Sequence, residues 1–390
     1  MARQRLRIDQ VRVGAPLMFD VYDEAGRLLL RRGNRIVNGA QLERLVESGV
    51  YADAPGATPD AGTVDDDLVV HFRLRPSPHR AARVSIPVLL GEAAGRLETL
   101  LSDVGVTDDF ALEIRSLADG IRKCGELDGD AALAHVQLAR QARYPIRQAL
   151  NAALVSAMLF ARLNLDPPRA SAGIAAALTM NIGMLALQQA LYERRGDITP
   201  EDAAAIRSHP RRGADLLRAR GVVNDVWLAA VEQHHEARDG SGYPAGLKGD
   251  AACREAQVIG LADRYCSMVS ERAYRPAFAP AIVLKELHQK HGAAFDPALI
   301  GALVTLLGIY PPGTFVKLAN GETALVARRL LDVKHPVAYA LYLNPRSPYE
   351  TPRKRLTASQ PQFAIDHVLD RSAVTLPIEP ELFWPRSVDT

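Results

Sequence analysis

The sequence has few cysteines, no dominant charge and no long hydrophobic run. Among its 390 residues there are three cysteines and no CxxC pair, so neither a disulfide framework nor a zinc ribbon is indicated; they are Cys124, Cys253 and Cys266. The 47 basic and 45 acidic residues give a formal net charge of +2, which favours neither DNA nor an anionic membrane as a partner. We therefore expect a reducing cytosolic environment, and any phosphate binding must come from a local group of residues.

The apolar content is typical of a globular protein rather than a membrane protein. The longest apolar run, residues 172–187, is too short for a comfortable span and carries Asn181 near its middle, so we predict a buried helix. The N-terminal stretch "MARQRLRIDQVRVG" lacks the apolar segment of a signal peptide. With 48% hydrophobic and 24% charged residues, the composition indicates two or three domains, a cytoplasmic location and no membrane partner.

The N-terminal part predicts a small β-rich module. Apolar and polar residues alternate in "MFDVYDEAGRLLLRRGNRIV", and the short helical pattern "GAQLERLVESGV" follows, so we assign an accessory module to residues 1–52. Residues 53–85 are expected to be a linker, because "YADAPGATPDAGTVDDD" concentrates Pro, Gly, Ala and Asp without periodicity. Four arginines near its end either contact a nucleotide or partner or belong to a solvated linker; they are Arg73, Arg75, Arg80 and Arg83.

The remainder predicts a mainly α fold class. Apolar residues recur at spacings of three and four in "LLGEAAGRLETLL" and "IRQALNAALVSAMLFARL", which indicates an all-helical domain within residues 86–325. Alternation returns in "FVKLANGETALVAR", where Asn320 and Gly321 predict the turn of a closing β-hairpin. We expect this short β appendage to end the domain and residues 326–390 to form a C-terminal extension.

One stretch combines metal-binding and phosphate-binding chemistry. In "HHEARDGSGYPAGLKGD", residues 234–250, His234 and His235 are candidate metal ligands because imidazole nitrogens bind transition metals. Gly240, Gly242 and Tyr243 are candidates for nucleotide contact, because glycine-rich turns bring backbone amides close to phosphate groups. The alternatives are histidines that cap or pack a helix and a turn with a purely structural use.

These residues resemble the HD-GYP domains, which are all-α, metal-dependent phosphodiesterases of the HD superfamily that cleave cyclic di-GMP. The HHE, DG, GYP and GL elements match in register, and the resemblance covers residues 140–325. The segment "SHPRRGADLL" implies a metal ligand at His209, and "GLADRYCSMVSERAYRPA" implies one at Asp263. Asp263 can alternatively cap a helix or pair with a cation.

The second of these segments also implies phosphate contacts at Arg272 and Arg275. We predict that these arginines lie three apart on one helix face and form a phosphate clamp, because guanidinium forks match phosphate oxygens. The alternative is surface ion pairing with acids such as Glu271.

The chain departs from the family pattern at positions that carry the family's metal-binding residues. Where the family has a phrase of the type HDIGK, this chain has "MNIGM", so that Met180, Asn181 and Met184 stand for histidine, aspartate and lysine. Gln148 stands at the position of an earlier histidine ligand, and Cys266 replaces a second aspartate. A two-metal site needs a carboxylate to offset the repulsion between its cations, and a neutral amide does this poorly. We interpret the substituted residues as a core that has exchanged charge for packing.

The resemblance therefore implies one depleted metal position and one that persists. The depleted position keeps Asp263 alone, whereas the other keeps three histidines that suit a single divalent transition metal, Fe, Mn or Zn, or hold none; they are His209, His234 and His235.

We accordingly hypothesise a protein of cyclic di-GMP signalling, inactive or severely impaired in hydrolysis, that acts as a nucleotide-binding or protein-interaction module. A second hypothesis is a weak phosphodiesterase that uses the residual three-histidine site. A third is a scaffold that binds no nucleotide. A protein partner is predicted in the first and third cases, no DNA partner in any, and homodimerisation is left open.

Overall fold

The computed structural model describes residues 3–5, 21–22, 28–30, 51–53, 84–102, 109–273, 275–289, 292–330, 332–344, 347–384 and 387–388. The chain divides into two compact units, Met1–Ser77 and Pro78–Thr390. The helical pattern expected at residues 39–50 lies outside the described residues, as do the four arginines whose contact with a nucleotide or partner was considered: Arg73, Arg75, Arg80 and Arg83.

The first unit contains a small antiparallel sheet. Its strands run in the order β1-β4-β2-β3 and are β1 (Arg3–Arg5), β2 (Val21–Tyr22), β3 (Leu28–Leu30) and β4 (Tyr51–Asp53). β2 and β3 pair with each other, with Val21 opposite Leu30. The β character predicted for residues 1–52 is present in these strands.

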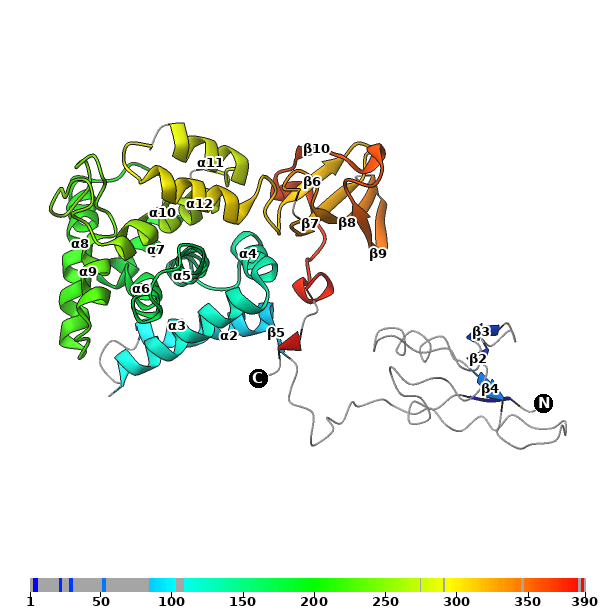
Figure 1. Cartoon of the computed structure of the whole chain (residues 1–390), viewed down its shortest axis with the longest axis horizontal. Helices are drawn as coiled ribbons and strands as arrows, with labels where there is room; N and C mark the ends of the chain where they lie inside the picture. The colour runs from blue at the N-terminus through cyan, green and yellow to red at the C-terminus, as the bar shows by residue number, and fades with distance from the viewer. Residues whose placement is uncertain are drawn as a thin grey trace. The chain divides into compact units, whose positions relative to one another are not determined.

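The second unit begins with a bundle of helices, as predicted from the periodicity. They are α2 (Ile86–Ser102), α3 (Phe110–Leu127), α4 (Gly129–Leu138), α5 (Tyr144–Arg162), α6 (Pro167–Thr179), the short 3-10 helix η2 (Ile182–Met184), α7 (Leu185–Glu193), α8 (Pro200–Ala219), α9 (Asp225–Gln233), α10 (Arg254–Val269), α11 (Pro280–Gln289) and α12 (Pro297–Leu307). Figure 1 shows α5 in the middle of this bundle, and every residue from Tyr144 to Phe160 is buried. A helix that is buried on all sides forms the centre of a core.

The apolar run at residues 172–187 is buried, but it is not one helix. α6 ends at Thr179, and η2 separates it from α7. The break lets η2 pass close to α8: a Cβ on Gly183 would lie 2.4 Å from the carbonyl oxygen of His209, so only glycine permits the approach. By length and composition, Pro167–Glu193 could cross a membrane, yet 72% of its most apolar window is buried inside the structure.

The helices that carry the candidate histidines have well-defined starts. α8 follows a capping box in which the Thr199 side chain accepts from the Asp202 N–H and the Asp202 side chain accepts from the Thr199 N–H. At the start of α9, the Asn224 side chain accepts from the Trp227 N–H at 2.9 Å. These caps fix the start of the helix that contains His209 and of the helix that His234 and His235 follow.

A five-stranded antiparallel sheet follows the helices. Its order is β10-β6-β7-β8-β9, and the strands are β6 (Phe315–Leu318), β7 (Thr323–Arg328), β8 (Val337–Asn344), β9 (Ser347–Leu356) and β10 (Ile365–Val368). The hairpin predicted at Asn320 and Gly321 is confirmed, since Phe315 pairs with Leu325 and Gly321 has φ +87°. The sheet is larger than the predicted appendage, because β8 also buries its side chains and needs partners on both edges.

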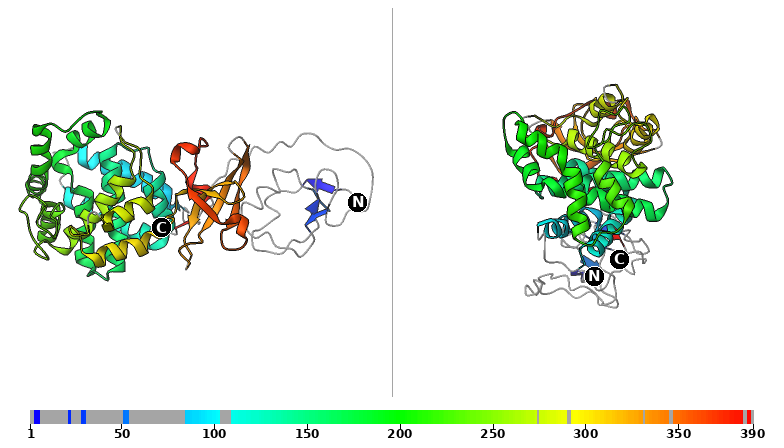
Figure 2. Two further views of the ribbon diagram at one scale, coloured as in Figure 1. Left: turned by 90° about the horizontal axis from the view of Figure 1, so that it is seen from above. Right: turned by 90° about the vertical axis from the view of Figure 1, so that its left-hand side faces the viewer.

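The C-terminal residues return to the helical bundle. Trp384 is fully buried and its Nε1–H donates to the carbonyl oxygen of Ala327 at 2.8 Å. Beyond it, β11 (Ser387–Val388) pairs with β5 (Val84–Ser85) just before α2. The left view of Figure 2 shows the helices and the sheet of this unit side by side.

Candidate functional site

Three of the predicted metal ligands come together in space. His209 lies in α8, and His234 and His235 directly follow α9, the neighbouring helix (Figure 1). Their ligand nitrogens all lie within 4.8 Å of one another. His209 and His234 are buried, whereas His235 is half-buried. The adjacent pair His234 and His235 and the His-Pro segment with His209 thus supply one cluster.

The hydrogen bonds of the cluster orient its lone pairs. His209 Nδ1 donates to the carbonyl oxygen of Ile206 at 2.6 Å, and His234 Nδ1 donates to that of Val231 at 2.7 Å. Each bond places the proton on Nδ1 and leaves Nε2 with a free lone pair. The two Nε2 atoms are 3.3 Å apart. Nitrogens bound at about 2.0–2.1 Å to one tetrahedral metal have roughly this separation, so the geometry fits one ion.

The histidines are neutral at physiological pH. Burial, with a smaller contribution from a neighbouring histidine, lowers the pKa of His209 and of His235 to about 3. The same causes lower the pKa of His234 well below its usual value. Neutral imidazole is the form that binds metals, so these residues need not lose a proton to act as ligands.

A glycine packs against the backbone of each histidine. A Cβ at any of these glycines would lie within 2.5 Å of a histidine carbonyl oxygen; the pairs are Gly183 with His209, Gly260 with His234, and Gly242 with His235. Real Cβ atoms do not approach backbone so closely, so a larger residue would displace the histidine-bearing segment. The glycine in "MNIGM" therefore has a positioning role that sequence reasoning missed.

The acid in the HHE element holds the glycine-rich loop. Glu236 accepts from the backbone N–H of Ala245 at 2.6 Å and of Leu247 at 2.8 Å. Tyr243 donates its backbone N–H to the carbonyl oxygen of His235 at 3.1 Å, and its ring stacks on the imidazole with centroids 4.7 Å apart. The loop is thus bound to the metal-ligand cluster. The position of Glu236 beside the two histidines was the available sequence signal for this role.

The loop glycines serve backbone geometry. Gly240 has φ +80°, and a Cβ there would lie 2.6 Å from Cε of Lys248. Ser241 donates its N–H and hydroxyl to Asp239 Oδ1, which closes the turn. Arg207 lies over the Tyr243 ring, 5.3 Å from its centroid, so a cation faces the same ring that contacts the histidines. Arg207 was not anticipated from the sequence.

Asp263 is not one of the three clustered ligands, and it is bound by Gln148. The Gln148 Nε2 donates to Asp263 Oδ1 at 2.8 Å and to its carbonyl oxygen at 2.9 Å, while Tyr144 donates to Gln148 Oε1 at 3.3 Å. Burial raises the pKa of Asp263, and the bond from Gln148 and the charge of Arg272 oppose that shift. A carboxamide thus satisfies the carboxylate that the resemblance implies as a metal ligand.

The "MNIGM" residues are packed unequally. Met180 is fully buried in the core, and Met184 is half-buried. Asn181 is 3% exposed, and its Oδ1 has no hydrogen-bond partner within the described part of the chain. A buried acceptor without a partner is costly, so apolar packing accounts for Met180 but not for Asn181. Cys266 is buried as well.

Arg272 and Arg275 do not share a helix face, and this prediction was wrong. α10 ends at Val269 because Ser270 has an extended backbone with ψ 135°. The two arginines pair with each other as an isolated antiparallel bridge, with N···O distances of 2.9 and 3.1 Å. Periodicity cannot reveal such a helix end, since no proline or glycine marks it.

The two arginines also have different partners. Arg272 donates to the hydroxyl groups of Tyr144 and Ser267 and lies 4.4 Å from the Tyr144 ring centroid. Arg275 donates to the carbonyl oxygens of Ser267 at 2.8 Å and Met268 at 3.1 Å, which serves the C-terminal end of α10. Arg272 therefore stands beside the Gln148 and Asp263 pair, whereas Arg275 stabilises the helix end.

The chain is similar to several known proteins. A family model described as HD domain matches residues 134–299. The cyclic di-GMP phosphodiesterase PA4108 of Pseudomonas aeruginosa is 26% identical over 337 residues, which cover 83% of this chain and 81% of that protein. The cyclic di-GMP phosphodiesterase response regulator RpfG of Xanthomonas campestris is 32% identical over 125 residues, covering 32% of this chain and 33% of that protein.

A solved structure supports the fold. Bd1817, an HDG"Y"P protein from Bdellovibrio bacteriovorus, aligns with a TM-score of 0.50 and 16% identity, covering 78% of this chain and 99% of that chain. The matched domain model, the relative aligned over most of both chains and this shared fold agree with the motifs and their geometry. The chain belongs to the HD-GYP family, as a member with Met180 and Asn181 in place of the His-Asp pair.

Proposed function

We propose that this protein acts in cyclic di-GMP signalling as a nucleotide-binding or protein-interaction module whose hydrolytic activity is lost or severely reduced. The observation that carries the proposal is the hydrogen bond from Gln148 to Asp263. It engages the one carboxylate that the family pattern retains at the depleted metal position. The similarity to proteins named cyclic di-GMP phosphodiesterases supports the choice of nucleotide.

Electrostatics supports the loss of a second metal. Two divalent cations repel each other strongly at the separation of a two-metal site, and bridging carboxylates offset that repulsion. Asn181 supplies a neutral oxygen at the position of the bridging aspartate, and Met180 is fully buried in the apolar core. Gln148 donates to Asp263 instead of offering a lone pair to a metal. The half of the site that would hold the second ion therefore has little negative charge to offer.

Nucleotide binding draws on side chains that remain suited to it. Arg272 presents a guanidinium beside Asp263, and its Nε has no partner within the described part of the chain. Guanidinium groups match phosphate oxygens in charge and geometry. Tyr243 adds an aromatic ring next to the histidines. We assign the phosphate contact to Arg272, and not to Arg275, which is bound to backbone carbonyls.

A second candidate function, weak phosphodiester hydrolysis, is favoured by the histidine cluster. Its three ligand nitrogens lie within 4.8 Å of one another, and two of them have their lone pairs set by backbone hydrogen bonds. A divalent metal held there would supply a Lewis acid for phosphodiester cleavage. The chain's own residues would orient the nucleotide, with Arg272 on a phosphate group and Glu236 keeping the loop in place.

The test combines turnover with binding. Protein loaded anaerobically with iron or manganese is incubated with cyclic di-GMP, linear product is resolved by chromatography, and His234→Ala is run alongside. Calorimetric titration with cyclic di-GMP measures binding. Micromolar binding without product supports the proposal, and product that disappears in His234→Ala establishes the weak enzyme instead. If neither binding nor product is observed, the remaining hypothesis is a scaffold that binds a protein partner and no nucleotide.

A further inference from the structure

A pocket of about 220 Å³ lies where the helical bundle meets the C-terminal sheet. One wall comes from the end of α4 and the segment before α11, and the other comes from the start of β6 and the turn after β10 (Figure 1). The residues that bear on its chemistry are Arg140, Phe278, Thr314, Phe315, Asp370 and Arg371. None of them belongs to the candidate site described above.

Two guanidinium groups from distant parts of the sequence face this pocket. Arg140 follows α4, and Arg371 begins the 3-10 helix η4 (Arg371–Ala373) after β10. Partial desolvation and the charges of Arg147 and Arg371 lower the pKa of Arg140, and the charge of Glu271 opposes this shift. Arg140 still keeps an exposed surface, so a ligand can reach it. Burial also lowers the pKa of Arg371. Like charges held together in a concave surface are unfavourable until an anion joins them.

Both arginines keep donors available. Arg140 donates one Nη1 hydrogen bond to the carbonyl oxygen of Ala139 at 2.7 Å. Arg371 makes a long Nη1 contact with the carbonyl oxygen of Val374 at 3.5 Å and lies over the Phe315 ring, 4.8 Å from its centroid. Among the described residues, neither forms an ion pair with a carboxylate within 4.0 Å. A guanidinium carries five N–H donors, so most of these donors remain for a ligand.

The other polar side chains that bear on the pocket's chemistry are a hydroxyl and a carboxylate. The Thr314 hydroxyl is buried and has no hydrogen-bond partner within the described part of the chain. The carboxylate in the pocket wall, Asp370, accepts from the backbone N–H of Ser372 at 2.8 Å and from its hydroxyl at 2.6 Å. These bonds lower the pKa of Asp370, so it is ionised and held in a turn, and it forms no ion pair with either arginine within 4.0 Å among the described residues.

We propose that this pocket binds the phosphate group of a small ligand, held between Arg140 and Arg371 with the Thr314 hydroxyl as a further donor. Two guanidinium forks suit the several oxygens of a phosphate better than the two of a carboxylate. Pockets for drug-sized ligands measure about 300–1,000 Å³, so a volume of about 220 Å³ suits inorganic phosphate or the phosphate end of a phosphomonoester. This inference is independent of the proposed function, because it uses none of the same residues.

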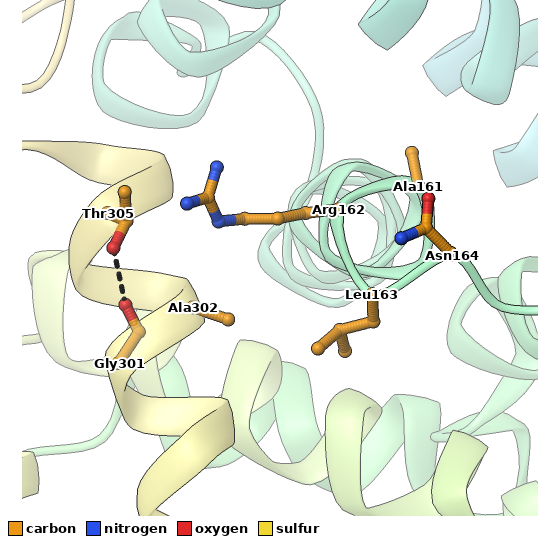
Figure 3. Close-up of a pocket in the computed structure, with 7 residues that line it drawn as sticks. All are labelled: Ala161, Arg162, Leu163, Asn164, Gly301, Ala302 and Thr305. Carbon is orange, nitrogen blue, oxygen red and sulfur yellow. Dashed lines mark hydrogen bonds between the residues drawn. The ribbon is translucent and has the colours of Figure 1, made fainter.

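A second pocket provides a matched control. It is lined by Ala161, Arg162, Leu163, Asn164, Gly301, Ala302 and Thr305, and Figure 3 shows Arg162 extending across it. Arg162 is the one charged residue in this lining, and the Thr305 hydroxyl already donates to the carbonyl oxygen of Gly301 at 2.8 Å. This pocket therefore contains an exposed arginine but neither a second cation nor an unpaired hydroxyl, so it tests whether a single arginine is enough for phosphate binding.

The experiment is a calorimetric titration of the full chain, freed of metal with a chelator, against inorganic phosphate and, separately, guanosine monophosphate. We expect one phosphate per chain, with affinity weakened about tenfold or more in Arg140→Gln and in Arg371→Gln, because each removes a charge-assisted hydrogen bond. Arg162→Gln should bind as the unsubstituted chain does. Arg371→Lys keeps the charge but loses the planar guanidinium. Its phosphate affinity should lie between that of the unsubstituted chain and that of Arg371→Gln.

The outcomes separate the sources of the phosphate. Tighter binding of the monophosphate than of inorganic phosphate identifies a phosphomonoester ligand, and equal binding identifies the free anion. An absence of saturable phosphate binding, or binding that is unchanged in both Arg140→Gln and Arg371→Gln, overturns the proposal. Repeating the titration in His234→Ala checks the location, since a loss of binding there would place the phosphate at the histidine cluster and also overturn it.

Discussion

The two halves of the candidate site differ in how their polar groups are satisfied. On the histidine side, Nδ1 atoms donate to backbone carbonyls and lone pairs are left facing one another. On the other side, Gln148 donates to Asp263, so the protein itself supplies a partner for the carboxylate. Internal hydrogen bonds thus satisfy the carboxylate side, while the histidine side has a geometry complementary to an ion. This difference is the basis of our proposal that one metal position is lost and the other kept.

Close backbone contacts accompany both the substituted residues and the histidines of the site. Gly183 lies between two substituted positions, yet it still allows η2 to pass against the carbonyl oxygen of His209. Gly260 and Gly242 do the same for the other two histidines. The segment "MNIGM" thus makes a close backbone contact although the residues beside its glycine differ from the family phrase.

The largest expected effect comes from breaking the histidine half. His234→Ala removes one of three clustered imidazoles, so we expect the affinity of the chain for a divalent metal to fall about a hundredfold or more. The metal content should then fall from about one ion per chain to none detectable. Metal content after dialysis, measured by mass spectrometry, checks this. His335→Ala removes an exposed histidine that contacts Asp332 and should retain the metal. Full occupancy in His234→Ala would contradict the assignment.

The next test restores the depleted half. Combining Gln148→His, Met180→His and Asn181→Asp returns two imidazoles and a carboxylate, which should offset the repulsion between two cations. We expect about two metals per chain and cyclic di-GMP turnover raised about tenfold or more over the unsubstituted chain. If the triple variant folds, binds one metal and shows no added turnover, these three substitutions do not explain why one half of the site is expected to hold a metal and the other is not.

A smaller effect is expected from the backbone contact shared by both halves. Gly183→Ala inserts a Cβ at 2.4 Å from the carbonyl oxygen of His209, and overpacking of this kind destabilises by about 1–3 kcal/mol. Denaturant unfolding measures the loss, and metal affinity should fall with it. Gly120→Ala, in helix α3 with nothing within 4 Å of the new Cβ, should be neutral or stabilising. Equal stability of the two variants would contradict a positioning role for Gly183.

The smallest effect is expected from Gln148→Leu, and it should depend on pH. The pKa of Asp263 is raised in the folded state, so the stability linked to this group is full below its unfolded pKa and is lost as the pH rises through the folded value. The bond from Gln148 opposes that shift. Its removal should therefore cost about 1–2 kcal/mol at pH 7 and less at pH 4.

Unfolding at both pH values measures this dependence. Gln362→Leu, at an exposed position, is the matched control and should show no such difference. A cost for Gln148→Leu that is the same at both pH values would mean that the hydrogen bond does not act on an ionised Asp263.

Much of the local structure followed from the sequence. Apolar spacing predicted the helices, and Asn320 with Gly321 predicted the hairpin, because these features depend on neighbours a few residues apart. The motif around His234 and His235 led to the correct family for the same reason, since its elements lie within 17 residues of sequence, from His234 to Asp250. Met180 and Asn181 could likewise be recognised as substitutions before their surroundings were known.

The sequence by itself therefore determined the helical class, the family motifs and the residues that stand where the resemblance implies metal ligands. Only the tertiary structure decided that Gln148 binds Asp263, 115 residues away, and that Arg272 and Arg275 turn to different partners after α10 ends. It also brought Arg140 and Arg371 to one pocket. The physical reason is that periodicity reports which face of an element is buried, whereas hydrogen bonds and charge clusters depend on which distant elements the folded core brings together.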